Sequence, residues 1–454
     1  MRQSPPGVVR RAVTLVALSL TFGLVQFDAT VVNVALKTVQ SDLGGGIEAA
    51  QWLVDGYAVP FAACMLAAGA LGDRFGHRLA CVLGFVIFGL ASLVAAVSTG
   101  WPMLITARAV QGVGAAIMLP ASLALIGRQY PDSHARSRAL GIWGGIATAG
   151  FAAGPVVGGL LIKSVGWQSI FWLNLPVAAV VGTVIGLLAP RDVRSTRRPD
   201  LAGTVLAVAA LAALTAGIIE GVRLPLLGLV LIIVAIGCGV LFVIIERRSP
   251  EPLLPGELLR PPAFRWALTT GLIFNMSIYG SLLCVSLALQ SAYGFSPIRA
   301  GLAVLPMALV VSVGATSSGF LVARLGARLP MIIGFGWGVI GLSIITIGAL
   351  TRQPILIIVG LAVFGLLSLA MPAMTSVALN AAPLRHAGFA GGSLNTARQL
   401  GGAIGVALLG AILNAAGYRT GFALAAVLAT VITAVGLLSS LRATVRQPQA
   451  DEGS

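Results

Sequence analysis

Charged residues are scarce in this sequence. Only 9% of its 454 residues are Asp, Glu, Lys or Arg, whereas about 25% is usual for soluble domains. Hydrophobic residues make up 57%, and the mean hydropathy is +0.98. This composition excludes a soluble globular chain. It predicts a polytopic helical membrane protein, because a membrane β-barrel would show alternating segments of about ten residues instead.

Lysine, histidine and cysteine are also rare, and each scarcity argues against a class of protein. The two lysines, Lys37 and Lys163, do not follow a phosphate-cradling GxxxxG, which argues against an ATP-driven pump. The three histidines fall in expected cytoplasmic loops and no HExxH is present, which argues against an intramembrane hydrolase. The four cysteines lack paired spacing, so we expect no disulfide. We also expect no metal site or other cofactor.

Long apolar runs predict fourteen membrane spans, each of about 20 residues. The expected ranges are 12–36, 48–71, 79–98, 102–127, 138–162, 167–189, 201–220, 224–245, 265–289, 299–323, 329–350, 354–380, 388–414 and 418–441. An even number places both termini on one side. The loops and tails of that side hold 21 arginines, against six basic residues on the other. The positive-inside rule therefore predicts cytoplasmic termini in a plasma membrane. Because the basic residues form no continuous patch, the net charge of +15 does not indicate nucleic-acid binding.

Two longer basic, proline-containing loops, 190–200 and 246–265, bracket the seventh and eighth expected spans. Such composition is typical of linkers. The predicted organisation is an N-terminal six-helix lobe, a linker with two additional transmembrane helices, a C-terminal six-helix lobe and a cytoplasmic tail. The corresponding ranges are 1–189, 190–264, 265–441 and 442–454.

An internal repeat supports two related halves. GALGDRFGHRL (69–79) and GFLVARLGARL (319–329) agree at six of eleven positions, and each joins the second and third helix of its half. Related halves are typical of two-lobed transporters, whose substrate site lies between the lobes at mid-membrane. The first copy is either a solvated charge cluster or a latch that closes the cytoplasmic face. Its candidate residues are Gly69, Gly72, Asp73, Arg74, Gly76 and Arg78.

Three charged residues are expected inside the first half, namely Asp28, Asp55 and Arg108. An acid at membrane depth costs roughly 2.5–3.5 kcal/mol even on lenient insertion scales, so it needs a partner, water or a proton. At 1.5 Å per residue all three lie about 9–12 Å below the outer surface. They could form a buried network with one carboxylate free to bind and release a proton. The alternative is a fixed ion pair that only holds helices together.

Further polar and flexible residues could line a cavity, although ordinary packing explains each one alone. These candidates are Asn33, Gln111, Tyr279, Met371, Met374, Asn395 and Arg398. A stripe of small residues with a proline could pack a neighbouring helix closely. It comprises Gly150, Gly154, Pro155, Gly158 and Gly159. The expected spans of the second half contain no acid, which mildly favours neutral or weakly charged substrates unless Asp28 or Asp55 neutralises a cation.

Several motifs together resemble a known family. They are FDATVVNVAL, WLVDGYAV, GALGDRFGHR, ITARAVQGVGAA, GFAAGPVVGG and NTARQLGGAIGVA. They resemble the fourteen-helix drug–proton antiporters of the major facilitator superfamily, although Lys37 stands where a proline is usual. The resemblance implies an all-α membrane fold of two six-helix lobes plus two central helices. It also implies a role for Arg108 in proton coupling.

The favoured hypothesis is a proton-driven exporter of amphipathic small molecules such as antibiotics, acting as a monomer in the bilayer. Export of a specific endogenous metabolite, such as an amino acid, a siderophore or a self-made antibiotic, is the alternative within transport. A membrane sensor that binds a ligand without moving it is the alternative outside transport.

Overall fold

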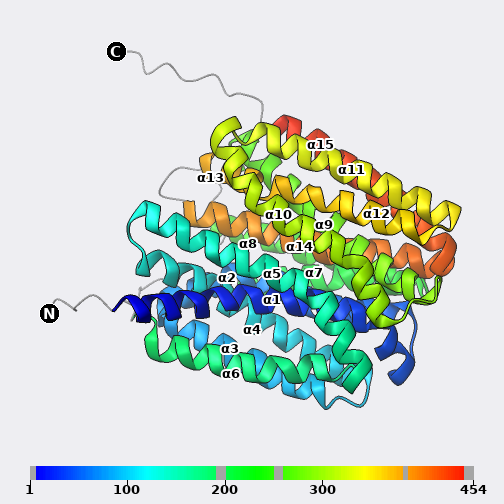
Figure 1. Cartoon of the computed structure of the whole chain (residues 1–454), viewed down its shortest axis with the longest axis horizontal. Helices are drawn as coiled ribbons and strands as arrows, with labels where there is room; N and C mark the ends of the chain where they lie inside the picture. Colours follow the sequence, from blue (N-terminus) through cyan, green and yellow to red (C-terminus); the bar gives the residue numbers. More distant parts are fainter. Residues whose placement is uncertain (1–6, 191–200, 250–258, 382–386, 444–454) are drawn as a thin grey trace.

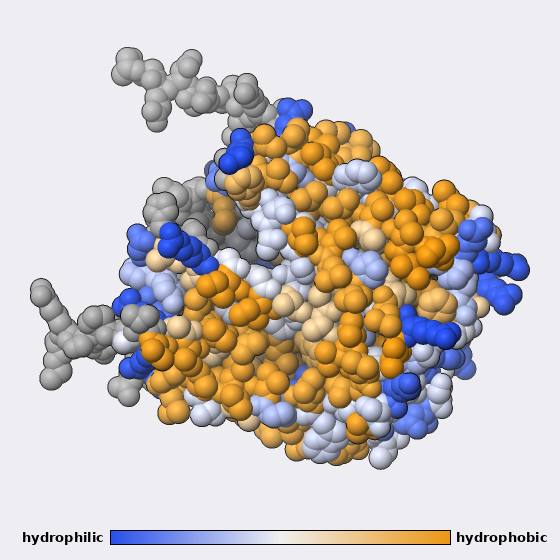
Figure 2. Space-filling view, viewed as in Figure 1, coloured by the Kyte–Doolittle hydropathy of each residue, from blue (hydrophilic) through white to orange (hydrophobic). Residues whose placement is uncertain are grey.

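Helices form nearly all of the computed structural model (Figure 1), which describes residues 7–190, 201–249, 259–381 and 387–443. Residues 191–200 and 250–258 of the two predicted linker loops, and most of the C-terminal tail, lie outside the described residues. Apolar residues cover the middle of the visible surface, and hydrophilic residues gather at its two ends (Figure 2). This distribution suits a protein whose middle faces lipid.

The first six helices coincide with the first six predicted spans. Several extend beyond their apolar run, most clearly the first. Their bounds are α1 Val8–Leu43, α2 Ile47–Phe75, α3 His77–Ala96, α4 Trp101–Gln129, α5 Ser133–Val165 and α6 Ser169–Leu188.

The remaining helices follow the later apolar runs, with two irregular turns among them. Their bounds are α7 Leu201–Gly221, α8 Pro225–Arg248, α9 Pro262–Ser291, α10 Pro297–Leu325, α11 Arg328–Thr351, α12 Pro354–Phe364, η2 Gly365–Leu369, α13 Ala370–Asn380, α14 Ala387–Ala416, η4 Gly417–Gly421 and α15 Phe422–Ala443. By length and hydropathy, twelve stretches of the described helices could cross a membrane. This number counts α14 and α15 as one stretch, Ala390–Ala443, and does not include α2.

The predicted span 354–380 is not one regular helix. A 3₁₀ turn, η2, separates α12 from α13, and Pro372 follows in the first turn of α13. Proline has no backbone N–H and therefore leaves a helical carbonyl without its usual donor. The hydroxyl of Ser318 on α10 donates to the carbonyl of Leu369 at 2.5 Å. A neighbouring helix thus satisfies part of the interrupted backbone, as the apolar surroundings require.

The helices form two bundles that lie side by side. The first bundle comprises α1–α6 and the second comprises α9–α15. In Figure 1, α3, α4 and α6 lie on one side of the molecule and α11, α12 and α15 on the other. The bundles contact each other through α2 with α14, α5 with α10, and α1 with α9. In the same view α1 begins and α15 ends at the same end of the molecule.

Contacts between the bundles concentrate at the end opposite the start of α1. Ser286 donates to the carbonyl of Asn33 at 2.6 Å, and Gln51 donates to the carbonyl of Ala407 at 2.9 Å. Gly301 also lies directly against the backbone of Pro155. Figure 2 shows the surface hollowed at the other end, on the side where α1 begins. The bundles are therefore held together at the end opposite the start of α1, and a surface hollow lies at the other end.

Helices α7 and α8 pack against each other, and α7 also lies against α2 and α14. On the α2 side, the indole of Trp52 donates to the carboxylate of Glu220 at 3.0 Å. Leu211 of α7 packs in one apolar cluster with Val59 of α2 and Ala403 of α14. Helix α7 thus contacts both bundles.

The small residues of α5 bring its backbone against α1. A Cβ atom at Gly150 would lie 2.2 Å from the carbonyl oxygen of Gly23, and one at Gly154 would lie 2.0 Å from the hydroxyl of Thr30. A Cβ at Gly158 would lie 2.5 Å from the side chain of Val31. Such distances are shorter than any carbon contact allows, so only glycine permits this approach.

We expect Gly154→Ala to lower the thermal unfolding midpoint of the purified protein, because overpacking of this kind costs about 1–3 kcal/mol. Gly144→Ala is the matched control, since a Cβ at this second α5 position meets nothing within 4 Å. Equal midpoints for the two variants would contradict the close α1–α5 contact.

Candidate functional site

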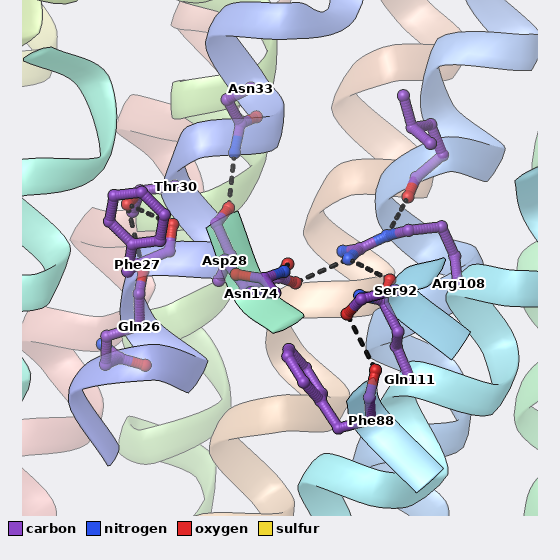
Figure 3. A network of polar contacts seen from close by, with 12 residues as sticks. Gln26, Phe27, Asp28, Thr30, Asn33, Phe88, Ser92, Arg108, Gln111 and Asn174 are labelled. Carbon is purple, nitrogen blue, oxygen red and sulfur yellow. Dashed lines mark hydrogen bonds and ion pairs between the residues drawn. The ribbon is translucent and has the colours of Figure 1, made fainter. Parts of the chain in front are cut away.

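The pair formed by Asp28 on α1 and Arg108 on α4 joins four helices of the first bundle (Figure 3). Nη1 of Arg108 lies 2.5 Å from Oδ2 of Asp28, and Nε of Arg108 donates to the carbonyl of Leu53 on α2 at 3.2 Å. The amide of Asn174 on α6 donates to the other carboxylate oxygen of Asp28 at 3.0 Å. The side chains of Asp28 and Arg108 are each only 1% exposed. The carboxylate thus accepts one hydrogen bond on each oxygen, which offsets part of the cost of burying it.

A chain of hydrogen bonds continues from Arg108 toward α3. Its Nη1 also donates to Oε1 of Gln111 at 3.0 Å, and the Gln111 amide donates to the hydroxyl of Ser92 at 2.6 Å. Ser92 in turn donates to the carbonyl of Phe88 at 2.7 Å. The guanidinium lies 4.4 Å from the ring centroid of Tyr57, which adds a cation–π contact. Arg108 is therefore held from several directions.

Asp55 is buried separately from this pair. Its side chain is fully buried, and neither carboxyl oxygen has a hydrogen-bond partner among the described residues. It follows Leu53 by two residues on α2, but it does not bond to Arg108 as Asp28 does. An ionised carboxylate without partners is very costly in such a place, so the neutral acid suits it better.

The predicted common depth of the three charges depended on where the spans end. Helix α1 continues to Leu43, so Asp28 lies fifteen residues before its end instead of the expected eight. Asp55 and Arg108 lie eight and seven residues after the starts of α2 and α4. Counted from the end of helix α1, Asp28 therefore lies deeper than Asp55 and Arg108. Counted from the end of the apolar run at residue 36, it lies at about their level.

A cavity lies between the two bundles, next to the Asp28–Arg108 pair. Helices α1, α2 and α4 line it from the first bundle, and α9 and α14 line it from the second. The lining residues are Val25, Gln26, Ala29, Val32, Val54, Tyr57, Ala58, Phe61, Arg108, Tyr279, Gln399, Gly402 and Val406. Mostly apolar walls with a few polar groups are typical of a small-molecule site.

Of the predicted cavity residues, Tyr279 lines this space, as does Arg108. Gln111 belongs to the polar chain instead, and Asn33 donates to the carbonyl of Ala29 within α1 at 2.8 Å. Met374 is buried. The remaining candidates, Met371, Asn395 and Arg398, are partly buried and do not belong to the lining.

Sequence reasoning missed several groups of the site. Asn174, Gln26 and Tyr57 are polar residues within apolar runs, and this was the available signal. Which of them would meet Asp28 or the cavity depends on the packing of separate helices, which one sequence does not reveal.

The turn between α2 and α3 contains the candidate conformational residues. Gly76 adopts φ +99°, a conformation that favours glycine. Arg74 is exposed and stacks on the ring of Phe75 at 5.3 Å, and Arg78 donates to the carbonyl of Ala189 at 3.3 Å. A side chain at Gly72 would collide with the adjacent histidine ring, whereas Gly69 faces open space. The side chain of Asp73 lies outside the described part, so the latch stays a prediction.

Comparison with known proteins matches the family model of the Major Facilitator Superfamily to residues 18–406 and 318–453. The chain belongs to this superfamily. It is 35% identical over 408 residues to the Multidrug resistance protein Stp of Mycobacterium tuberculosis (strain ATCC 25618 / H37Rv), covering 88% of this chain and 76% of that protein. It is also 35% identical over 406 residues to the Methylenomycin A resistance protein of Bacillus subtilis (strain 168), covering 88% and 87%.

Solved transporter structures share the fold. A peptide transporter POT in complex with sulfate superposes with a TM-score of 0.71 at 18% identity, covering 95% of this chain and 94% of that one. The major facilitator chain described here is therefore an all-helical, multi-pass membrane transporter of small molecules, and it is not an enzyme.

We expect Arg108→Gln to lower the unfolding free energy by about 3–5 kcal/mol, because it leaves the Asp28 carboxylate buried without its charged partner. The double variant Asp28→Asn/Arg108→Gln removes both charges and should recover part of that loss. Denaturant unfolding of the purified protein would measure both. Strictly additive losses would show that the two side chains are not coupled.

Proposed function

We propose that this transporter exports amphipathic small molecules, antibiotics among them, in exchange for protons across the plasma membrane. The relatives named for multidrug and methylenomycin A resistance support the substrate class. The observation that carries the coupling proposal is the buried Asp28–Arg108 pair beside a cavity between two bundles. A proton that crosses the membrane needs a group that can bind and release it, and a buried carboxylate is such a group. Ionisable groups inside membranes mark proton and substrate pathways.

Protonation of Asp28 would change the balance of forces at the pair. A proton on Oδ2 removes the negative charge that Arg108 and Asn174 now neutralise and solvate. The guanidinium, which already borders the cavity, then loses its counter-charge, and α1, α4 and α6 lose the contact that joins them. Deprotonation restores the pair. The pair is therefore an element with two states whose balance a proton sets.

Asp55 supplies a second carboxyl group that could bind and release a proton. Its orphaned oxygens suit a neutral acid in the state described, and access to water in another state would favour release of its proton. The proton stoichiometry would then be as high as two.

The transport cycle that we propose is alternating access between two lobes, 1–189 and 265–441, with two additional helices between them. The proposal takes fourteen spans, with α2, α14 and α15 counted separately and α12 to α13 counted as one. The arginine excess predicts cytoplasmic termini. With that orientation the closed end faces outward and the hollowed end faces the cytoplasm, as in a state ready to take up substrate from inside. We propose that the monomer is the working unit, since the cavity is formed within one chain.

We expect Asp28→Asn to abolish the discharge of a pH gradient when an exported drug is added to energised inverted vesicles. The amide cannot carry a proton, although its size is unchanged. Asp42→Asn is the matched control on the same helix, where the carboxylate accepts from the indole of Trp167 at 2.7 Å and lies away from the cavity. Equal discharge by Asp28→Asn and the control would remove Asp28 from the mechanism.

A further inference from the structure

The second bundle contains a cation within a helix, Arg398, for which the described part of the chain shows no carboxylate partner. Arg398 lies in the middle of α14, ten or more residues from either end of that helix. No residue from Leu258 to Ala450 is an aspartate or a glutamate. A guanidinium keeps its charge at any physiological pH, so this charge is never lost by deprotonation. Nothing else in the second bundle can supply a carboxylate.

The acids of the first bundle do not neutralise Arg398 either. Asp28 is engaged by Arg108 and Asn174, and the carboxyl oxygens of Asp55 accept no hydrogen bond from any described residue. The contrast with Arg108 is informative, because that arginine has its own carboxylate and Arg398 has none.

The contacts of Arg398 leave most of its hydrogen-bonding capacity unused. Its Nη2 points to the thioether of Met371 at 3.6 Å, and its guanidinium lies 5.4 Å from the ring centroid of Phe274. Its enclosed Nε has no partner in the described structure. A thioether is a weak acceptor, whereas a guanidinium offers five donors in a planar fork. One turn earlier, the amide of Asn395 likewise donates only to a thioether, that of Met65 at 3.0 Å.

The surroundings of Arg398 connect it to the cavity. Gln399, the next residue, lines the cavity and accepts from the amide of Asn275 at 3.2 Å. Gly402, one turn further, also lines it, and a Cβ there would lie 3.1 Å from the ring of Tyr279. Arg398 therefore lies one helical turn from the cavity wall, and its side chain is only partly buried.

We infer that Arg398 binds an acidic group of the substrate, of the carboxylate class, while the apolar part of the same molecule occupies the cavity. A carboxylate matches the guanidinium fork with two parallel hydrogen bonds and replaces the thioether as acceptor. The absence of acids from the second bundle thus selects for anionic substrates, not neutral ones. This inference rests on the proposed export function and specifies its substrate class.

Matched pairs of compounds test the inference. The probes are 1-naphthaleneacetic acid with 1-naphthaleneacetamide, and salicylic acid with salicylamide, which differ mainly in charge at pH 7. Binding to the purified transporter is measured by calorimetry, and discharge of the pH gradient in inverted vesicles is measured separately. We expect each acid to bind about tenfold more tightly than its amide, the scale of a charge-assisted contact.

Variants assign that preference to one residue. Arg398→Gln should remove the preference for the acids and leave amide binding within twofold, whereas Arg398→Lys should keep part of it because the charge remains. Arg442→Gln is the matched control, since Arg442 stacks on the ring of Trp266 at 5.0 Å and is exposed at the end of α15. Its preference should equal that of the unaltered protein. Size-exclusion profiles and unfolding midpoints establish that the variants are folded.

The outcomes separate this inference from the proposed function. Equal binding of acids and amides by the unaltered protein, or a preference that survives in Arg398→Gln, overturns the inference while proton-driven export of other drugs can still be observed. Acid-selective binding that Arg398→Gln abolishes, without any discharge of the gradient, supports the anion site and contradicts proton coupling. No binding of any of the four probes also overturns the inference.

Discussion

The free-energy cost of burying a charge away from water determines how the Asp and Arg side chains inside this molecule are arranged. Four Asp and Arg side chains lie deep in its described helices, and they meet that cost in three different ways. Asp28 and Arg108 neutralise each other and recruit Asn174, Leu53 and Gln111 for the remaining hydrogen bonds. Asp55 has no partner and is best accommodated as a neutral acid. Arg398 has no carboxylate partner among the described residues, and we infer that a substrate supplies one.

Close packing of small residues lets the helices carry these polar groups without opening gaps. The glycines of α5 place its backbone against α1, directly beside the turn that holds Asp28. Thr30, two residues after Asp28, also donates to the carbonyl of Phe151 on α5 at 3.1 Å. In lipid, helix association depends on such contacts because no water is expelled between the helices. The position of the carboxylate is therefore set partly by residues that have no charge at all.

Much of this arrangement could be predicted from the sequence, because a membrane span is a local property. Runs of about 20 apolar residues located the helices, and polar residues within those runs located Asp28, Arg108 and Arg398. The ends of α1 could not be predicted as well, since a helix continues past its apolar run when nothing stops it. The break at η2 escaped detection because its compensation comes from Ser318 on another helix.

The neighbours of each charge were the least predictable part. Whether Arg108 pairs with Asp28 or with Asp55 depends on the rotation of α1 and α2 about their axes. Both acids fitted the same depth estimate. Asn174 was hidden in an apolar run of α6, although it completes the carboxylate site. Such pairings arise from residues 80 or more positions apart and are settled by the packing of whole helices.

Helix α7 has a different attachment on each of its two sides. Toward α2 it has both a directional bond from Trp52 to Glu220 and an apolar contact of Leu211 with Val59, whereas toward α14 the contact is aliphatic, around Ala403. Aliphatic surfaces can slide past one another at little energetic cost, whereas a hydrogen bond is lost when its donor and acceptor move apart. If the two bundles move relative to each other, the Trp52–Glu220 bond favours α7 and α8 moving with α2 and sliding along α14. They would keep lipid tails out of the seam throughout the cycle.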